Sequence, residues 1–160
     1  MSDYGDVNDF QSAKNQIHFK VDNQTSFDLE PQEYYAYFGN FEEEPSEIQS
    51  NSSGSGGHLV SSRNPFGGTT GMVGYKIIGG SETLYLRFLA TNPYMSAKDN
   101  TSISAILDND AGINQSNYKS LEKREEQDDT RSFHGGTLKV TSAIGQADDA
   151  TAFFTITFEE

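Results

Sequence analysis

Cysteine and tryptophan are both absent from this sequence of 160 residues. Without cysteine the chain can form neither a disulfide framework nor a thiolate metal site, which excludes disulfide-stapled secreted domains and zinc ribbons. Cohesion must instead come from a packed core and from hydrogen bonds between strands. At 17.6 kDa the chain is large enough for one domain that buries roughly two thirds of its unfolded surface.

Long apolar runs are also missing. No stretch approaches the ~18 apolar residues that a membrane-spanning helix needs. Residues 1–6 lack the basic patch and the apolar run of a secretory signal peptide. We therefore expect a soluble product, which is either cytoplasmic or secreted without a classical signal peptide.

Basic residues are scarce, and this sets the charge of the molecule. Eleven lysines and arginines stand against 24 aspartates and glutamates, for a formal net charge of −13. A nucleic-acid backbone or an anionic lipid surface would repel such a molecule. Neutral glycans and zwitterionic lipid headgroups meet no comparable long-range repulsion. These are the expected partners, and nucleic acid is not.

The best-patterned stretch of the chain is residues 67–94. Apolar residues alternate with other residues over 73–78 and again over 84–88, which is the period of two typical of half-buried strands. Residues 79–81, Gly-Gly-Ser, supply the backbone freedom that a tight turn between them needs. The sequence therefore predicts a central β-hairpin, preceded by a glycine-rich loop at 67–71 and followed by a proline-ended loop.

Weaker patterns predict the remaining elements. One amphipathic surface helix is expected at 114–127, where Tyr118 and Leu121 share a face. The glycine- and serine-rich segment 49–57 and the acidic run 41–45 are interpreted as loops, because neither has much to bury. Further strands are expected at 17–21, 34–38, 58–61, 101–107, 138–142 and 152–158.

Motifs for catalysis, nucleotide binding and metal binding are not found. The glycine-rich stretch 67–71 is not followed by Gly-Lys-Ser/Thr and leads into a strand rather than a helix. Asp108 starts a segment similar to a calcium loop, but no glutamate follows at the closing position. His18, His58 and His134 lie in no triad motif. The sequence predicts a protein that is not an enzyme and uses no metal or cofactor.

Several short motifs follow one another in a characteristic order. They are Gly71-Met72-Val73-Gly74-Tyr75, Thr83-Leu84 with Phe88, Pro93-Tyr94, Tyr118 on the expected helix, and Phe133-His134-Gly135-Gly136. In this order they resemble the actinoporin-like superfamily, which includes the pore-forming actinoporins and the fungal fruit-body lectins. The resemblance covers residues 15–158 and implies a mainly β fold, an actinoporin-like β-sandwich with one or two short flanking helices.

The resemblance also implies two kinds of ligand site. Actinoporins hold a phosphocholine headgroup among a proline, a serine, a valine and several tyrosines, which implies roles for Val73, Pro93, Tyr94 and Tyr118. The fruit-body lectins contact galactose-type sugars through a loop rich in glycine, serine and threonine and through an asparagine and an arginine, which implies roles for Gly68, Thr69, Thr70, Asn92 and Arg124.

The expected function is non-enzymatic, lectin-like recognition of glycan headgroups at a cell surface. The alternative is a binder of membrane lipids such as sphingomyelin, or an actinoporin-like pore-forming cytolysin, which would be a toxin. Residues 1–14 read as a flexible acidic leader without the long amphipathic helix that actinoporins insert, and residues 15–160 as a single β-sandwich domain. Both functions are compatible with contact at a membrane surface and with a homo-oligomer.

Overall fold

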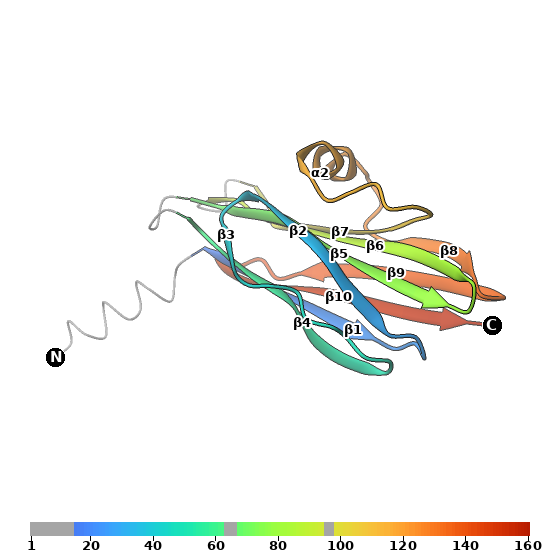
Figure 1. The fold of residues 1–160 in the computed structure, drawn as a ribbon. Coiled ribbons are helices and arrows are strands. Elements are labelled where there is room, and N and C mark those ends of the chain that lie inside the picture. Colours follow the sequence, from blue (N-terminus) through green and yellow to red (C-terminus); the bar gives the residue numbers. More distant parts are fainter. Residues whose placement is uncertain (1–14, 63–66, 95–97) are drawn as a thin grey trace.

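The computed structural model describes residues 15–62, 67–94 and 98–160, so the expected leader lies outside the described residues. Two β-sheets pack face to face, and the helix α2 (Gln115–Glu122) lies on the outer face of one of them (Figure 1). The mainly β sandwich expected from the sequence is thereby confirmed. No helix of the described part is long and apolar enough to cross a bilayer.

The larger sheet has the strand order β3-β4-β1-β10-β9-β8, and the smaller sheet has the order β2-β5-β6-β7. Strands β1 and β10 run parallel to each other, and the other paired neighbours are antiparallel. The bounds are β1 Gln16–Asn23, β2 Leu29–Phe38, β3 Asn40–Glu43, β4 Ser52–Val60, β5 Thr69–Gly79, β6 Glu82–Asn92, β7 Thr101–Leu107, β8 Asp129–Phe133, β9 Gly136–Ile144 and β10 Asp149–Glu159.

The predicted central hairpin is confirmed and forms the middle of the smaller sheet. Strands β5 and β6 pair without interruption from Thr69 and Asn92 at one end to Gly79 and Glu82 at the other. Gly80 in the turn has a φ of +63°, a conformation that glycine adopts without strain. Apolar clusters pack on both faces of this long, regular hairpin.

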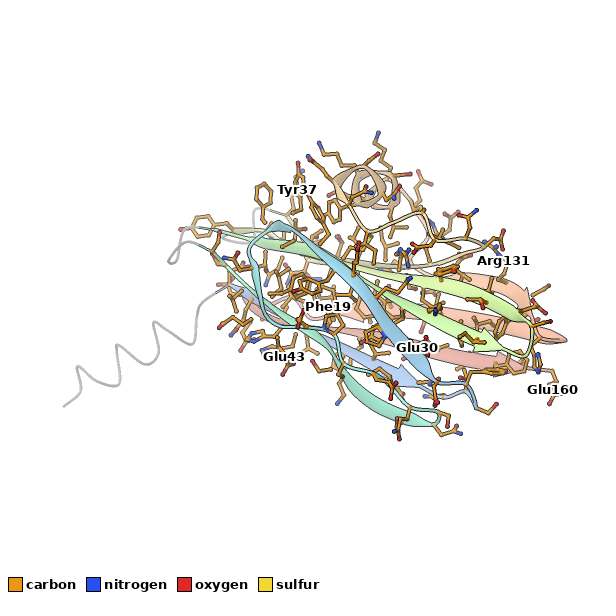
Figure 2. The ribbon with its side chains drawn as sticks, viewed as in Figure 1. Phe19, Glu30, Tyr37, Glu43, Arg131 and Glu160 are labelled. Atoms are coloured by element: carbon orange, nitrogen blue, oxygen red, sulfur yellow. The ribbon has the colours of Figure 1, made fainter. Side chains whose placement is uncertain are left out.

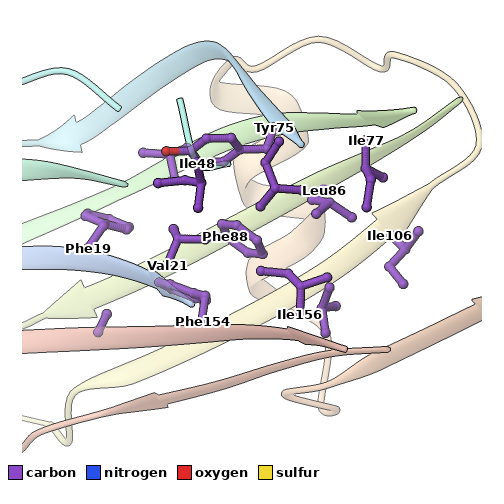
Figure 3. Packing of buried hydrophobic residues seen from close by; sticks show 14 of the residues in the cluster. Phe19, Val21, Ile48, Tyr75, Ile77, Leu86, Phe88, Ile106, Phe154 and Ile156 are labelled. Atoms are coloured by element: carbon purple, nitrogen blue, oxygen red, sulfur yellow. The ribbon is translucent and has the colours of Figure 1, made fainter. Parts of the chain in front are cut away.

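The smaller sheet is buried on both faces. Figure 2 shows Phe19 between the two sheets, whereas Tyr37 lies on the side that carries α2. Between the sheets, Phe88 stacks on Phe154 with ring centroids 4.7 Å apart, and Phe19 stacks on Phe154 at 5.9 Å. Figure 3 shows these rings among the aliphatic side chains of both sheets. Burial of this apolar surface is the main force that holds the sheets together.

A second, smaller apolar cluster lies between the smaller sheet and α2. Tyr118 and Leu121 of the helix pack there against Met72 of β5 and Leu89 of β6. Asn114 caps the helix, since its side-chain oxygen accepts a hydrogen bond from the backbone N–H of Asn117 at 3.0 Å. The helix is thus fixed at its start and along one face.

The helix is shorter than the predicted span of 114–127. It ends at Glu122, and the backbone N–H of Arg124 donates back to the carbonyl of Leu121 at 3.0 Å. Beyond this turn, the carbonyl of Gln127 accepts from the backbone N–H and from the hydroxyl of Ser104 in β7, each at 2.9 Å. Pairing with the sheet edge replaces further helical hydrogen bonds, so the prediction was wrong for the last turn.

The interpretation of 49–57 as a loop was wrong, because most of this segment is strand β4. A β-carbon at Gly54 would lie 2.6 Å from Ile48 Cδ1, and one at Gly56 would lie 2.9 Å from Val21 Cγ2. Large neighbouring side chains therefore occupy the space above the glycines. The sequence of β4 is rich in glycine and serine, because the apolar side chains that pack over this strand belong to neighbouring segments.

Two edge strands were also missed. The acidic run 41–45 was expected to be a loop, but its first part belongs to β3, where Phe41 pairs with Leu59 of β4. Strand β8 pairs with β9 and ends at the buried Phe133. Both strands are short and mostly exposed, so they lack the alternation that marks the central strands.

Candidate ligand-binding cavity

A cavity of about 760 Å³ opens at the end of the sandwich that lies away from the C-terminus. Its walls come from the end of β2, the start of β5 and the end of β6, which Figure 1 shows at this end, and from Glu122, the last residue of α2. We call it the end cavity. Its volume lies within the range of about 300–1,000 Å³ found for small-molecule sites.

The end cavity brings together most of the residues that the sequence named as candidates for ligand binding. The glycine-rich loop and the proline-ended loop, far apart in the sequence, lie side by side because β5 and β6 pair at this end. The candidates that line the cavity are Gly68, Thr69, Thr70, Asn92, Pro93 and Tyr94.

Three candidates lie elsewhere. Val73 points into the core between the sheets and has no exposed surface, so a ligand cannot reach it. Tyr118 is also fully buried and lies behind the cavity wall. Arg124 lines a different pocket on another side of α2. The candidate site that remains is therefore the two loops and the groups that surround them.

Polar groups at the floor of the cavity bond to one another rather than facing the solvent. Thr69 donates from Oγ1 to Asn15 Oδ1 at 2.7 Å, and Asn15 Nδ2 donates to Asn92 Oδ1 at 3.2 Å. The amide of Asn92 also donates to the carbonyl oxygens of Asp148 at 2.7 Å and Gln16 at 3.0 Å. This network ties the two sheets together, and it leaves Thr69 and Asn92 little capacity to bind a ligand.

Gly68 allows the two loops to approach closely. A β-carbon there would lie 2.8 Å from the carbonyl oxygen of Asn92 and 2.9 Å from the backbone nitrogen of Tyr94. Any other residue would push the backbone at Pro93 and Tyr94 outward. The glycine thus fixes the position of this cavity wall.

Aromatic rings form the wall toward α2. Tyr37 stacks on Tyr118, with ring centroids 5.2 Å apart and planes 14° apart. Phe38 meets the edge of Tyr37 at 4.7 Å and is 60% exposed at the rim of the cavity. Figure 2 shows Tyr37 projecting on the helix side of the sandwich. The wall therefore consists of a tyrosine ring stacked on a second tyrosine, with an exposed apolar ring beside it.

The hydroxyl of Tyr118 connects the wall to the floor. It lies 2.8 Å from the Thr70 hydroxyl and donates to Glu122 Oε2 at 3.3 Å. Burial raises the pKa of the Tyr118 phenol, so the group is neutral at physiological pH. The exposed carboxylate of Glu122 is thereby held next to the aromatic wall.

Sequence reasoning missed more than half of the residues that line the end cavity. Its charged and hydroxyl groups come mainly from the rim, where the hydroxyls of Thr91 and Thr101 lie 2.6 Å apart. The one signal in the sequence was the aromatic run 34–38, which holds more rings than the inner face of a single strand needs. The missed residues are Tyr37, Phe38, Gly39, Ser61, Ser62, Thr91, Lys98, Asp99, Thr101 and Glu122.

No histidine is among the described residues that line the end cavity. His18 and His58 stack on each other on the outer face of the larger sheet, and His134 lies in the turn before β9. Among residues 15–62, 67–94 and 98–160, no three histidine, aspartate or glutamate side chains are arranged to hold a metal ion. The described lining, with its hydroxyl and aromatic side chains, is suited to non-covalent binding of a ligand.

Neither protein-family models nor curated protein sequences match this chain. Solved structures do. The lipid binding protein Nakanori has a TM-score of 0.68 at 15% identity, over 96% of this chain and 76% of that protein. The Xerocomus chrysenteron lectin XCL has a TM-score of 0.51 at 11% identity, over 90% of this chain and 99% of the lectin. These likenesses confirm the actinoporin-like and fungal-lectin fold that the sequence motifs implied.

Proposed function

We propose that the end cavity binds the headgroup of a zwitterionic membrane lipid of the phosphocholine type, without catalysis. The observation that carries the proposal is the exposed ring of Phe38 at the rim of a cavity lined by Tyr37 and Tyr94. Exposed aromatic side chains beside a polar site are favourable at the boundary between water and lipid.

The charges around the end cavity match both halves of such a headgroup. A choline cation is attracted to tyrosine rings, and Tyr94 is the candidate here because Lys119 Nζ already lies 5.5 Å from the ring centroid of Tyr37. The carboxylate of Glu122 lines the same cavity. Lys98 and the hydroxyls of Thr91 and Thr101, which line the same cavity together with Asp99, are suited to the phosphate. A net charge of −13 opposes approach to an anionic surface, so a zwitterionic headgroup fits better than an anionic one.

A glycan is the second candidate. Hydroxyl groups together with a tyrosine face are also what a sugar ring needs. However, Thr69 and Asn92, which the resemblance to the lectins favoured, spend their hydrogen bonds within the protein. The rim also carries an exposed apolar ring, which a water-soluble glycan does not require. For these reasons we place the lipid headgroup first.

The likenesses in fold support binding in general. One similar structure is described as a lipid binding protein and the other as a lectin. Since both are below 25% identity, they do not choose between the two ligands. The choice comes from the lining of the end cavity in this chain.

Vesicle flotation tests the proposal. The full chain is mixed with vesicles of phosphatidylcholine, of sphingomyelin and of phosphatidylglycerol, and with phosphatidylcholine vesicles in the presence of soluble phosphocholine. We expect flotation with the first two, less with the anionic lipid, and competition by phosphocholine. Dye trapped in the same vesicles reports separately on lysis.

A glycan array completes the test. Binding to glycans by folded protein that does not float with any vesicle would replace the lipid with the second candidate. Blank results in both assays would reject recognition at this cavity altogether. Flotation that phosphocholine does not reduce would assign lipid binding to another surface.

A further inference from the structure

A second pocket of about 400 Å³ lies between α2 and two edge strands, β7 of the smaller sheet and β8 of the larger sheet. We call it the arginine pocket, because Arg87, Arg124 and Arg131 line it. It shares no lining residue with the end cavity. Figure 2 shows Arg131 on the helix side of the sandwich, at a distance along it from Tyr37. The pocket is therefore a separate feature of the molecule.

Three arginines line the arginine pocket, in a chain whose formal net charge is −13. Each has an aspartate partner: Asp110 pairs with Arg87 at 2.9 Å, Asp108 pairs with Arg131, and Asp129, the one acidic residue of the lining, lies 3.6 Å from Arg124. Side-chain exposure is 2% for Arg87, 27% for Arg124 and 33% for Arg131. These guanidinium groups are largely shielded from water, which strengthens their interaction with an anion.

Each guanidinium is held in place by the fold. Arg87 donates to Asp110 Oδ1 at 2.9 Å and to Gln32 Oε1 at 3.1 Å, both through its Nη atoms. Its Nε is buried, and no hydrogen-bond partner for it occurs among the described residues. Arg131 donates from Nη2 to the carbonyl of Ile106 at 2.9 Å and from Nη1 to the carboxylate of Asp108. The arginines are thus ordered before any ligand arrives, which lowers the entropy cost of binding.

Arg124 is fixed by the backbone rather than by a close carboxylate. Its Nη atoms donate to the carbonyls of Ser104 at 3.3 Å and Asp128 at 3.1 Å, while the nearest carboxylate oxygen, in Asp129, is 3.6 Å away. Neutral carbonyls orient this guanidinium without cancelling its charge. Arg124 therefore remains the least neutralised cation of the pocket.

The rest of the lining is mostly apolar. Met72, Ala105 and Ile106 come from the sheet, and Leu121 comes from the helix. Ser120, which is exposed on α2, stands at the same pocket. A ligand that fits this lining has one anionic group for the arginines and an apolar body for the side chains beneath.

We propose that the arginine pocket is a binding site for an amphiphilic carboxylate, a small molecule with one carboxylate group on an apolar body. The planar guanidinium fork matches the two oxygens of a carboxylate. A single negative charge suits the pocket better than a doubly charged phosphate, because Asp129 and the acidic molecule around it repel further charge. The site is independent of the function proposed for the end cavity.

Calorimetric titration of the full chain with octanoate, in a buffer of low salt, tests the site. We expect one molecule bound per chain. Octanamide has the same apolar chain as octanoate but no charge, and acetate has the carboxylate but no apolar chain. Each should bind about tenfold more weakly or worse, and octanoate affinity should fall as salt is added.

Two pairs of variants place the site. Ser120→Glu sets a carboxylate at the pocket and should weaken octanoate binding about tenfold or more, whereas Ser116→Glu on the same helix, which does not line the pocket, should leave it unchanged. Arg124→Gln should weaken binding to a similar degree, and Lys20→Gln in the larger sheet should not.

The proposal fails if octanoate does not bind at about 5 mM, well above the range of useful small-ligand affinity. It also fails if octanamide or acetate binds as tightly as octanoate. Equal weakening by Ser120→Glu and Ser116→Glu would place the binding elsewhere on the surface. Circular dichroism on each variant shows that the fold is retained, and vesicle flotation should be the same for Ser120→Glu as for the unmodified chain.

Discussion

The ring of Tyr37 lies almost parallel to the ring of Tyr118, with 14° between their planes. One ring belongs to strand β2 and the other to helix α2, so the stack joins the helix to the edge of the smaller sheet. Tyr37 also faces the end cavity, and Lys119 Nζ lies 5.5 Å from its ring centroid. The same contact therefore positions the helix and presents the aromatic wall.

Removal of the Tyr118 hydroxyl should cost little stability but loosen the wall. Tyr118→Phe keeps the stack and loses the hydrogen bonds to Thr70 and Glu122, so we expect a loss of about 0.5–1.5 kcal/mol. Tyr118→Ala removes a fully buried ring and should cost about 3–5 kcal/mol. Urea denaturation measures both. Equal losses for the two variants would show that the ring adds nothing to the fold.

Phe38 is expected to act at the membrane and not in the fold. Its ring is 60% exposed, so Phe38→Ala should change the free energy of unfolding by less than about 0.5 kcal/mol while flotation with phosphatidylcholine vesicles falls severalfold. Phe153→Ala removes another exposed ring, 48% exposed on the outer face of the larger sheet, and is the matched control. A similar loss of flotation in both variants would mean that the end cavity does not face the bilayer.

The alternation of apolar residues was sufficient to predict the central strands. It identified β1, β5, β6, β7, β9 and β10, because each of these strands buries at least one regular face. It found only the end of β4, at residues 58–60, and missed the first part of that strand, whose glycines lie beneath the side chains of Ile48 and Val21. A local sequence pattern shows which side chains a strand contributes to the core. It does not show which side chains from other segments cover that strand.

The candidate site was predictable only in part, for a related reason. The two loops could be named from their residue types, and the pairing of β5 with β6 then brought them together. The aromatic wall comes from β2 and is supported by α2, and residues 39–114 separate these two elements in the sequence. Nothing in the local sequence around Tyr37 or Glu122 shows that these elements meet.

Gly68 should be needed for binding more than for stability. A methyl group in Gly68→Ala would lie within 2.9 Å of backbone atoms of Asn92 and Tyr94, so the loop must shift and the cavity wall with it. We expect headgroup binding to fall about tenfold or more, with a stability loss of roughly 1–3 kcal/mol. Gly145→Ala is the control, since no atom lies within 4 Å of its added β-carbon. Unchanged flotation for Gly68→Ala would separate this loop from the ligand.

The stacked histidines should make the stability of the fold sensitive to pH. The rings of His18 and His58 lie 4.1 Å apart and 11° from parallel, on adjacent strands of the larger sheet. Burial lowers the pKa of His58, and the charge of His18 lowers it further, although Glu42, Glu43 and Asp149 oppose the effect. The folded pKa of His58 is therefore below the ordinary value of 6.5 that applies to the unfolded chain.

The sign of the pH effect follows from this difference. Below the unfolded pKa the unfolded chain binds a proton at His58 that the folded chain resists, so stability is complete above about pH 6.5 and falls as the pH drops through that value. His58→Gln should lose less stability than the unmodified chain between about pH 7.5 and 5.5. Carboxylates titrate mainly below this window. His134→Gln, at a histidine outside the stacked pair, should keep the original pH dependence. Urea denaturation at each pH gives the free energies, and identical slopes for all three proteins would show that the stacked pair does not sense protons.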